Sequence, residues 1–218
     1  MSVSVIAAAF IAVFVGQSSA ITDTLREEKQ RLSDCLEKIE TAPEEAYEDA
    51  LAWLNEGARP NARYCAALSL SALGLHGEAA SRLEALAQQK SSVTLGDRAV
   101  FLTQAGNAWL AAGLTEESIL ALSNALKINK TDPDLYKDRA AAFLAAERPH
   151  QALEDLNQAL TFNPADAEAY RLRALSYLQQ DAHDYALQDI ETSRRYDPQN
   201  IDTLVLRGEI REAMRKSR

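Results

Sequence analysis

Charged side chains recur at a fixed spacing along the second half of the chain. Arg139, Arg173 and Arg207 are each 34 residues apart, and Asp155 and Asp189 have the same spacing. Arginine and aspartate can form bidentate ion pairs, or they can together grip a charged ligand. We favour structural ion pairs, because a ligand site rarely repeats with the period of its scaffold.

Few residues in the sequence have types and spacings that could support catalysis or bind a metal ion. His76, His150 and His183 fall at or near predicted turns that are far apart along an extended array, so they cannot gather around one ion. The sequence contains no Gly-rich phosphate loop and no nucleophile–histidine–acid constellation. Acidic pairs such as Glu44-Glu45 lie at predicted helix starts, where they complement the helix dipole. We therefore predict no enzyme activity, no metal and no cofactor.

The elements that carry these residues are predicted to be helices. The chain has 218 residues with only 8 Gly and 6 Pro, and it is rich in Ala and Leu but poor in Val and Ile after residue 21. Ala and Leu favour helices, whereas β-branched residues favour strands. The net charge of −9, with scattered Lys and Arg, argues against binding to nucleic acid or to anionic membrane surfaces.

The first twenty residues have a different composition. No charged side chain precedes Asp23, and Val3–Val15 is an apolar run followed by Ser18, Ser19 and Ala20. A short apolar stretch followed by small residues is typical of a signal peptide, although no Lys or Arg precedes this run. We predict cleaved export to the periplasm or exterior and no stable membrane insertion afterwards. An uncleaved tether and a helix that belongs to the core are the alternatives.

The two cysteines, Cys35 and Cys65, lie in the part of the chain that would remain after cleavage. In an oxidising compartment an even number of cysteines favours a disulfide, and export would place the chain there. Closing a loop of about 30 residues would contribute roughly 3–4 kcal/mol in the chain-entropy model. The alternative is two small buried residues on neighbouring helices.

A 34-residue period organises the rest of the chain. It appears as columns of equivalent residues, each column with one residue type or size. The columns are large residues (Leu102, Tyr136, Tyr170, Leu204), small residues (Gly106, Ala140, Ala174, Gly208), aromatics (Trp109, Phe143, Tyr177), a second small column (Ser118, Ala152, Ala186), aliphatic residues (Leu122, Leu156, Ile190) and a third small column (Ala125, Ala159, Ser193). Pro164 and Pro198 end two of the units. Such a period indicates a repeat architecture in which each unit packs only on its neighbours.

The order large–small–aromatic, then small–Leu–small, then Pro resembles the tetratricopeptide repeat. The resemblance implies an all-α, right-handed α-solenoid of about four helix-turn-helix units with helical caps. We assign residues 1–20 to the signal peptide and 21–60 to an N-terminal helical cap or degenerate repeat. Residues 61–200 form the repeat array, and 201–218 a C-terminal capping helix with a polar outer face.

The same resemblance implies a concave groove lined by the first helix of each unit. The residues that this register places in the groove are Thr103, Asn107, Leu110, Lys137, Ala141, Leu144, Arg171, Leu175 and Leu178. This face could hold a peptide, with Lys137 or Arg171 meeting a carboxylate. A solvated groove without a ligand is the equally simple interpretation.

The resemblance and the export signal together predict a non-catalytic scaffold or adaptor in the bacterial periplasm. Its partner would be a protein or peptide segment bound in the groove. The alternative is an accessory or oligomerisation subunit of an envelope enzyme that docks through its convex surface.

Overall fold

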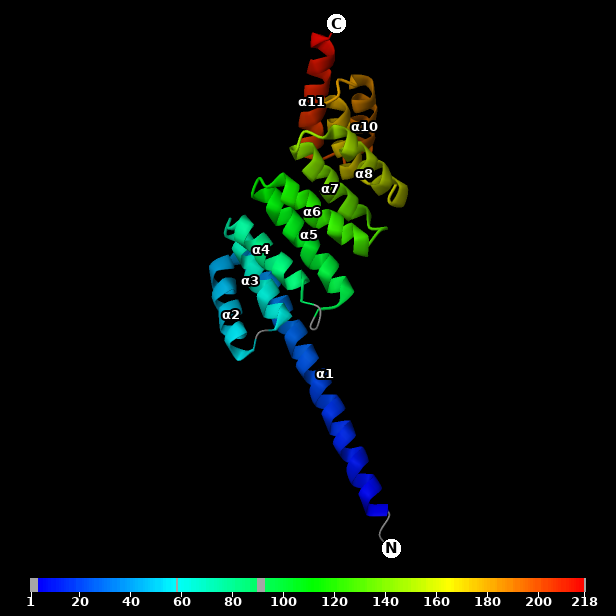
Figure 1. The fold of residues 1–218 in the computed structure, drawn as a ribbon. Coiled ribbons are helices and arrows are strands. Elements are labelled where there is room, and N and C mark those ends of the chain that lie inside the picture. Colours follow the sequence, from blue (N-terminus) through cyan, green and yellow to red (C-terminus); the bar gives the residue numbers. More distant parts are fainter. Residues whose placement is uncertain (1–3, 58, 90–92, 218) are drawn as a thin grey trace. The chain divides into compact units, whose positions relative to one another are not determined.

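The computed structural model describes the backbone of residues 4–57, 59–89 and 93–217, and within these ranges the side chains from residue 22 onward. Over these residues the chain forms eleven α-helices and no β-strand, which confirms the predicted all-α class (Figure 1). The chain divides into two units, Met1–Gly74 and Leu75–Arg218. The unit boundary thus lies within the predicted array, whose limits at residues 61 and 200 stay a prediction.

The N-terminal unit contains three helices: α1 (Ser4–Thr41), α2 (Pro43–Glu56) and α3 (Pro60–Ala72). Its core is built around Trp53, with Cys35, Ala50 and Cys65 buried beside it. Residues 1–3 and the side chains of residues 4–20 lie outside the described part, so the predicted signal peptide and its cleavage stay a prediction. Among the described residues, no helix combines the length and hydropathy needed to cross a membrane.

The C-terminal unit is a stack of helix pairs. Its helices are α4 (His76–Ala87), α5 (Leu95–Ala111), α6 (Thr115–Ile128), α7 (Pro133–Ala145), α8 (Pro149–Phe162), α9 (Ala167–Leu178), α10 (His183–Tyr196) and α11 (Ile201–Lys216). Each helix contacts the next, and α5 also contacts α7, α7 contacts α9, and α9 contacts α11. We call α5, α7, α9 and α11 the first-helix row. This arrangement is the α-solenoid that the repeat period predicted.

Polar side chains begin the helices of the first-helix row. The caps of α7, α9 and α11 are Asp132, Asp166 and Asn200, again 34 residues apart. The Asp166 side chain accepts a hydrogen bond from the Ala169 amide at 2.9 Å. Such caps satisfy amides that have no partner within the helix, and they fix where each first helix begins.

The turn within each helix pair uses a left-handed residue. Gly113, Glu147 and Asp181 have φ values of 76°, 57° and 57° and are also 34 residues apart. In the first of these turns the Leu114 amide donates to the Trp109 carbonyl at 2.9 Å, a bond that closes the end of α5. Glycine adopts this conformation freely, whereas Glu147 and Asp181 adopt it at a cost in backbone strain.

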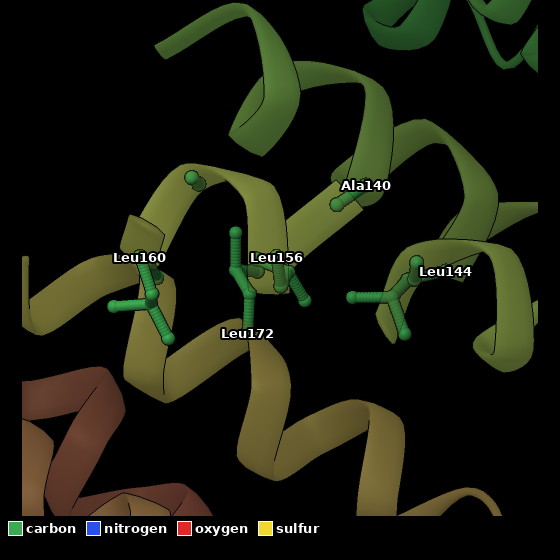
Figure 2. Packing of buried hydrophobic residues seen from close by; sticks show 8 residues of the cluster. Ala140, Leu144, Leu156, Leu160 and Leu172 are labelled. Atoms are coloured by element: carbon green, nitrogen blue, oxygen red, sulfur yellow. The ribbon is translucent and has the colours of Figure 1, made fainter. Parts of the chain in front are cut away.

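The columns of the period form the core. Figure 2 shows Leu156 of α8 among Ala140 and Leu144 of α7, Leu160 of α8 and Leu172 of α9. Leu156 and Ala140 are fully buried. The small residue lets α7 approach α8 closely, and the leucine fills the space between that pair and the next helix. Each pair therefore buries its apolar surface only with the help of its neighbour.

Candidate functional site

The recurring arginines bind carboxylates within the helix stack. The Arg139 guanidinium on α7 forms two hydrogen bonds of 2.7 Å to the Asp155 carboxylate on α8, and a third of 3.0 Å to the Ser123 hydroxyl on α6. Asp155 is only 5% exposed. The hydrogen bonds with Asp155 raise the pKa of Arg139, outweighing the opposing effect of burial. Arg139 thus joins its own helix pair to the preceding one.

Arg173 repeats this geometry one period later. Its Nε donates to Asp189 Oδ2 at 2.7 Å, and its Nη1 donates to Asn157 at 2.8 Å. In the preceding helix pair, α5 and α6, the equivalent positions are Ala105 and Ala121, and both are fully buried. In these three helix pairs the arginine and the aspartate are therefore present together or absent together, which is what a structural ion pair requires.

Arg207 departs from the pattern. Its Nε lies 2.5 Å from Glu191 Oε1 on α10, the helix before it. This is the backward contact that Arg139 makes with Ser123. The forward contact to a buried aspartate is missing, because α11 is the last helix of the described residues.

The predicted groove residues lie on α5, α7 and α9 of the first-helix row. On α5, the half-buried Thr103 donates to the Ala99 carbonyl of its own helix at 2.8 Å. Three half-buried leucines of this set also contact the core clusters beneath the row, so each presents only part of its side chain. These residues are Leu110, Leu175 and Leu178. Ala141 is half-buried as well.

Leu144 does not line a groove, contrary to the sequence prediction. It is 5% exposed and lies in the same core cluster as Ala140 and Leu156 (Figure 2). Leu144 is one helical turn after Ala140, so the two side chains share the face of α7 that packs on α8. The register that placed Leu144 on the open face was therefore wrong at this position.

Lys137 is already paired with carboxylates of this chain. Its Nζ lies 2.8 Å from Asp134 Oδ1 on α7 and 2.6 Å from Asp166 Oδ2 at the start of α9. Burial by itself would lower the pKa of Lys137, but the hydrogen bonds to Asp134 and Asp166 outweigh it and raise the pKa. Arg171 is likewise paired with Glu168 at 2.5 Å. The charge of each cation is therefore already balanced within this chain, and a partner's carboxylate would compete with these pairs.

Asp138 is the acidic counterpart on the same face. The Asn107 side chain on α5 donates to its Oδ2 at 3.1 Å, which links α5 to α7. Burial raises the pKa of Asp138, and the hydrogen bond from Asn107 only partly opposes this shift. Neighbouring Asp134 and Asp132 raise that pKa further, whereas the charge of nearby Lys137 opposes them. The polar part of this face therefore carries an excess of carboxylates.

An apolar hollow of about 310 Å³ lies beside this pair. It is lined by Leu95, Val100 and Thr103 of α5 and by Asp132 and Leu135 at the start of α7, among others. Asn107 is one turn beyond Thr103, and Asp138 is one turn beyond Leu135. The hollow, which Ile128 at the end of α6 also lines, and the Asn107–Asp138 pair one helical turn away are together the candidate site.

In the N-terminal unit, Cys35 and Cys65 form a disulfide that joins α1 to α3. The bond lies against Trp53 in the core and lines a hollow of about 360 Å³. The histidines are located at the starts of second helices: His76 begins α4 and His183 begins α10. Among the described residues, no group of His, Cys, Asp and Glu side chains could hold a metal ion.

No protein-family model and no curated protein sequence matches the chain. Among solved structures, TTC0263, a thermophilic TPR (tetratricopeptide-repeat) protein of Thermus thermophilus, superposes with a TM-score of 0.60 at 21% identity, over 86% of this chain and 98% of its own. MamA from Desulfovibrio magneticus RS-1 superposes with a TM-score of 0.68 at 15% identity, over 81% of this chain and 96% of its own.

The chain has the tetratricopeptide-repeat fold. The predicted resemblance is therefore confirmed at the level of the fold. A shorter match is the second TPR domain of human RPAP3 in complex with the HSP70 peptide SGPTIEEVD, with a TM-score of 0.51 at 21% identity, over 54% of this chain and 98% of its own. The first TPR of Spaghetti (RPAP3), bound to the HSP90 peptide SRMEEVD, matches with a TM-score of 0.52 at 23% identity, over 56% of this chain and 96% of its own.

Within this fold, sequence reasoning missed the acidic side chains that surround the predicted cations. Asp132 and Asp166 are one period apart, so the same self-comparison could have found them. Asp138 had no such signal, because its partner Asn107 is 31 residues away and the contact crosses between neighbouring helix pairs.

Proposed function

We propose that this chain is a non-catalytic interaction scaffold that binds a peptide or protein segment on the face between α5 and α7. The observation that carries the proposal is the apolar hollow at Thr103 and Leu135, with the half-buried Asp138 carboxylate one helical turn beyond Leu135. An apolar hollow with one fixed polar group can hold a side chain and orient its neighbour. The peptide complexes of two proteins of the same fold support this use of the architecture.

The charges of the face select the kind of segment. Lys137 and Arg171 are held by Asp134, Asp166 and Glu168, so they are occupied. Asp138 has a neutral partner, and its carboxylate is partly desolvated. A segment with an apolar side chain next to a lysine or arginine complements this arrangement, whereas an acidic segment is repelled.

Two peptides of equal length test the selection. One is SRMEEVD, the peptide named with the Spaghetti structure. The other is SRMKKVK with an amidated C-terminus, in which lysine replaces each acid. We expect the basic peptide to bind at least about tenfold more tightly in a fluorescence anisotropy titration of the full chain. Equal binding of both peptides, or tighter binding of SRMEEVD, would contradict the proposed selectivity.

A blocking variant tests the location. Thr103→Phe fills the hollow, and Gln151→Phe places the same side chain on the exposed side of α8 as a control. We expect Thr103→Phe to abolish binding of SRMKKVK and Gln151→Phe to leave it unchanged. Binding that survives Thr103→Phe in a folded protein would move the interaction to the convex surface and favour the accessory-subunit alternative.

We further propose that the scaffold works in the bacterial periplasm. The apolar run before Ser18 and the two paired cysteines support export, since disulfides persist in oxidising compartments. Mass spectrometry of the protein from a periplasmic extract should give a chain that begins at Ile21. An intact chain recovered only from the cytosol would overturn the assignment.

A further inference from the structure

Among the described residues α11 is the last helix, and it has the residues of a first helix on a face that no described second helix covers. Leu204 and Gly208 continue the columns of Tyr170 and Ala174. Ala140 and Ala174 are fully buried under the second helix of their own pair. On α11 the equivalent face is open, with Leu204 46% exposed and Ile201 74% exposed. The first two turns of this face are thus apolar rather than the polar surface expected of a capping helix.

The two helical glycines of the small column, Gly106 on α5 and Gly208 on α11, show the difference between a covered and an open first helix. A Cβ atom on Gly106 would lie 2.5 Å from Cγ of Leu122, because the leucine of α6 packs on that glycine. A Cβ atom on Gly208 would meet no atom within 4 Å. The place that Leu122 takes against α5 is therefore empty against α11.

The ion-pair pattern leaves a second position open on the same face. Arg139 and Arg173 each bind an aspartate of the following second helix, at 2.7 Å. Arg207 keeps only the backward contact to Glu191. Arg211, whose side chain is 52% exposed although its guanidinium lies 3.3 Å from Glu191 Oε1, and the exposed Arg215 continue the positive charge toward the end of α11. The open face therefore combines an apolar half with a basic half.

We propose that the outer face of α11, defined by Ile201, Leu204, Gly208, Arg211 and Arg215, docks an amphipathic helix of a partner protein. The helix lies antiparallel to α11, as α8 does to α7. It places a leucine on Gly208 and a carboxylate next to Arg207, with acidic residues toward its own N-terminus to meet Arg211 and Arg215.

A second copy of the chain fits this face poorly. Two α11 helices packed in parallel would bring Arg211 and Arg215 against their equivalents. Packed antiparallel, they would place the apolar turn at Leu204 against Arg211 of the other copy. Either arrangement forfeits the charge complementarity that an acidic helix supplies.

The probe is a peptide with the sequence of α8, Pro149–Phe162, because α8 makes this contact with α7; His150→Glu and Gln151→Glu in the peptide supply the acidic residues near its N-terminus. A lactam bridge between Glu154 and the side chain introduced by Gln158→Lys keeps the short peptide helical, and both positions are exposed on α8. We expect saturable binding of the labelled peptide to the full chain in fluorescence anisotropy. An Asp155→Asn peptide should bind about tenfold more weakly, the scale of one charge-assisted hydrogen bond.

Two variants of the chain locate the site. Gly208→Met occupies the open space and should weaken peptide binding at least about tenfold without unfolding the protein. Glu209→Met adds the same side chain at the next exposed position of α11 and should leave binding unchanged. Thr103→Phe should also leave it unchanged, which separates this surface from the proposed groove.

Each outcome of these binding experiments either supports or overturns the proposal. Loss of binding with Gly208→Met alone supports the proposal. Peptide binding that is insensitive to Gly208→Met, or no saturable binding to the folded chain, overturns it. A dimer seen by analytical ultracentrifugation that disappears with Gly208→Met also overturns it, because the face would then belong to a second copy.

Discussion

Arg139 binds Asp155 on its own helix pair and Ser123 on the preceding pair. Removing the arginine alone leaves a buried carboxylate without its partner, which is costly, whereas removing both charges leaves small apolar residues. One helix pair of the chain already has small apolar residues in place of both charges, because Ala105 and Ala121 occupy the equivalent buried positions in α5 and α6. The repeat therefore tolerates either two charges or none.

Arg139→Ala should destabilise the C-terminal unit by about 3 kcal/mol, since Asp155 stays buried and unpaired. The double variant Arg139→Ala with Asp155→Ala should recover most of this loss. Hydrogen exchange of the α7 and α8 amides measures both. If the double variant is as unstable as the single one, the pair contributes through packing and not through charge.

Asp138 links stability to pH. Because burial raises its pKa, the folded state binds this proton more tightly than the unfolded state does. The protonated Asp138 carboxyl stabilises the folded state fully at pH values below 3.8, the ordinary pKa of an aspartate. This stabilisation is lost as the pH rises through the higher pKa that Asp138 has in the folded state. At neutral pH the charged Asp138 carboxylate therefore destabilises the folded state.

Asp138→Asn should raise the unfolding temperature at pH 7, and the difference should disappear below about pH 4. Its amide oxygen can still accept the hydrogen bond from Asn107. Thermal melts of both proteins across this range measure the effect. A difference that stays constant with pH would assign the change to packing.

At the scale of elements, the disulfide fixes α1 against α3. Cys35 and Cys65 are 30 residues apart in sequence, and both are buried next to Trp53. The three helices of this unit have a small core, so a covalent link makes a large contribution to their stability.

Cys35→Ala with Cys65→Ala should lower the stability of α2 and α3 by about 2–4 kcal/mol, mainly because the unfolded chain gains freedom. Hydrogen exchange of the α3 amides measures the change, with the α9 amides as an internal reference. The unaltered protein treated with a reductant should behave in the same way. Unchanged protection of α3 would show that packing around Trp53 is sufficient.

At the scale of the whole molecule, each helix pair of the C-terminal unit is stabilised by its contacts with the adjacent pairs. α11 covers the end of the stack with Leu206 and Ile210, which are buried against Ile190. Burying two such side chains contributes roughly 3–6 kcal/mol. In a linear array this contribution acts mostly on the adjacent pair.

A chain that ends after Asn200 should therefore lose protection in α9 and α10 more than in α5 and α6. Hydrogen exchange resolved by helix is the measurement. A chain that ends after Lys216 serves as the control and should match the chain of 218 residues. Equal losses in all helices would show that the unit unfolds as one cooperative body.

The sequence by itself determined the helical class, the period and the residues of the core columns. This was possible because each helix pair repeats the same local packing, so Ala140, Leu156 and their equivalents must recur. The turn position was visible less clearly, since Glu147 and Asp181 do not carry the glycine that the left-handed backbone favours.

Only the tertiary structure decided which side chains are available. Lys137 was predicted to be a cation for a ligand, but its ion pair with Asp166 crosses from one helix pair to the next. Leu144 was predicted to lie in the groove, but it is buried in the core cluster of Ala140 and Leu156. Gly208 continues its column in sequence, yet only the missing neighbour makes it open. Composition and period describe the packing within one repeat, whereas the exposure and ion pairing of a side chain depend on which residues the next helix places against it.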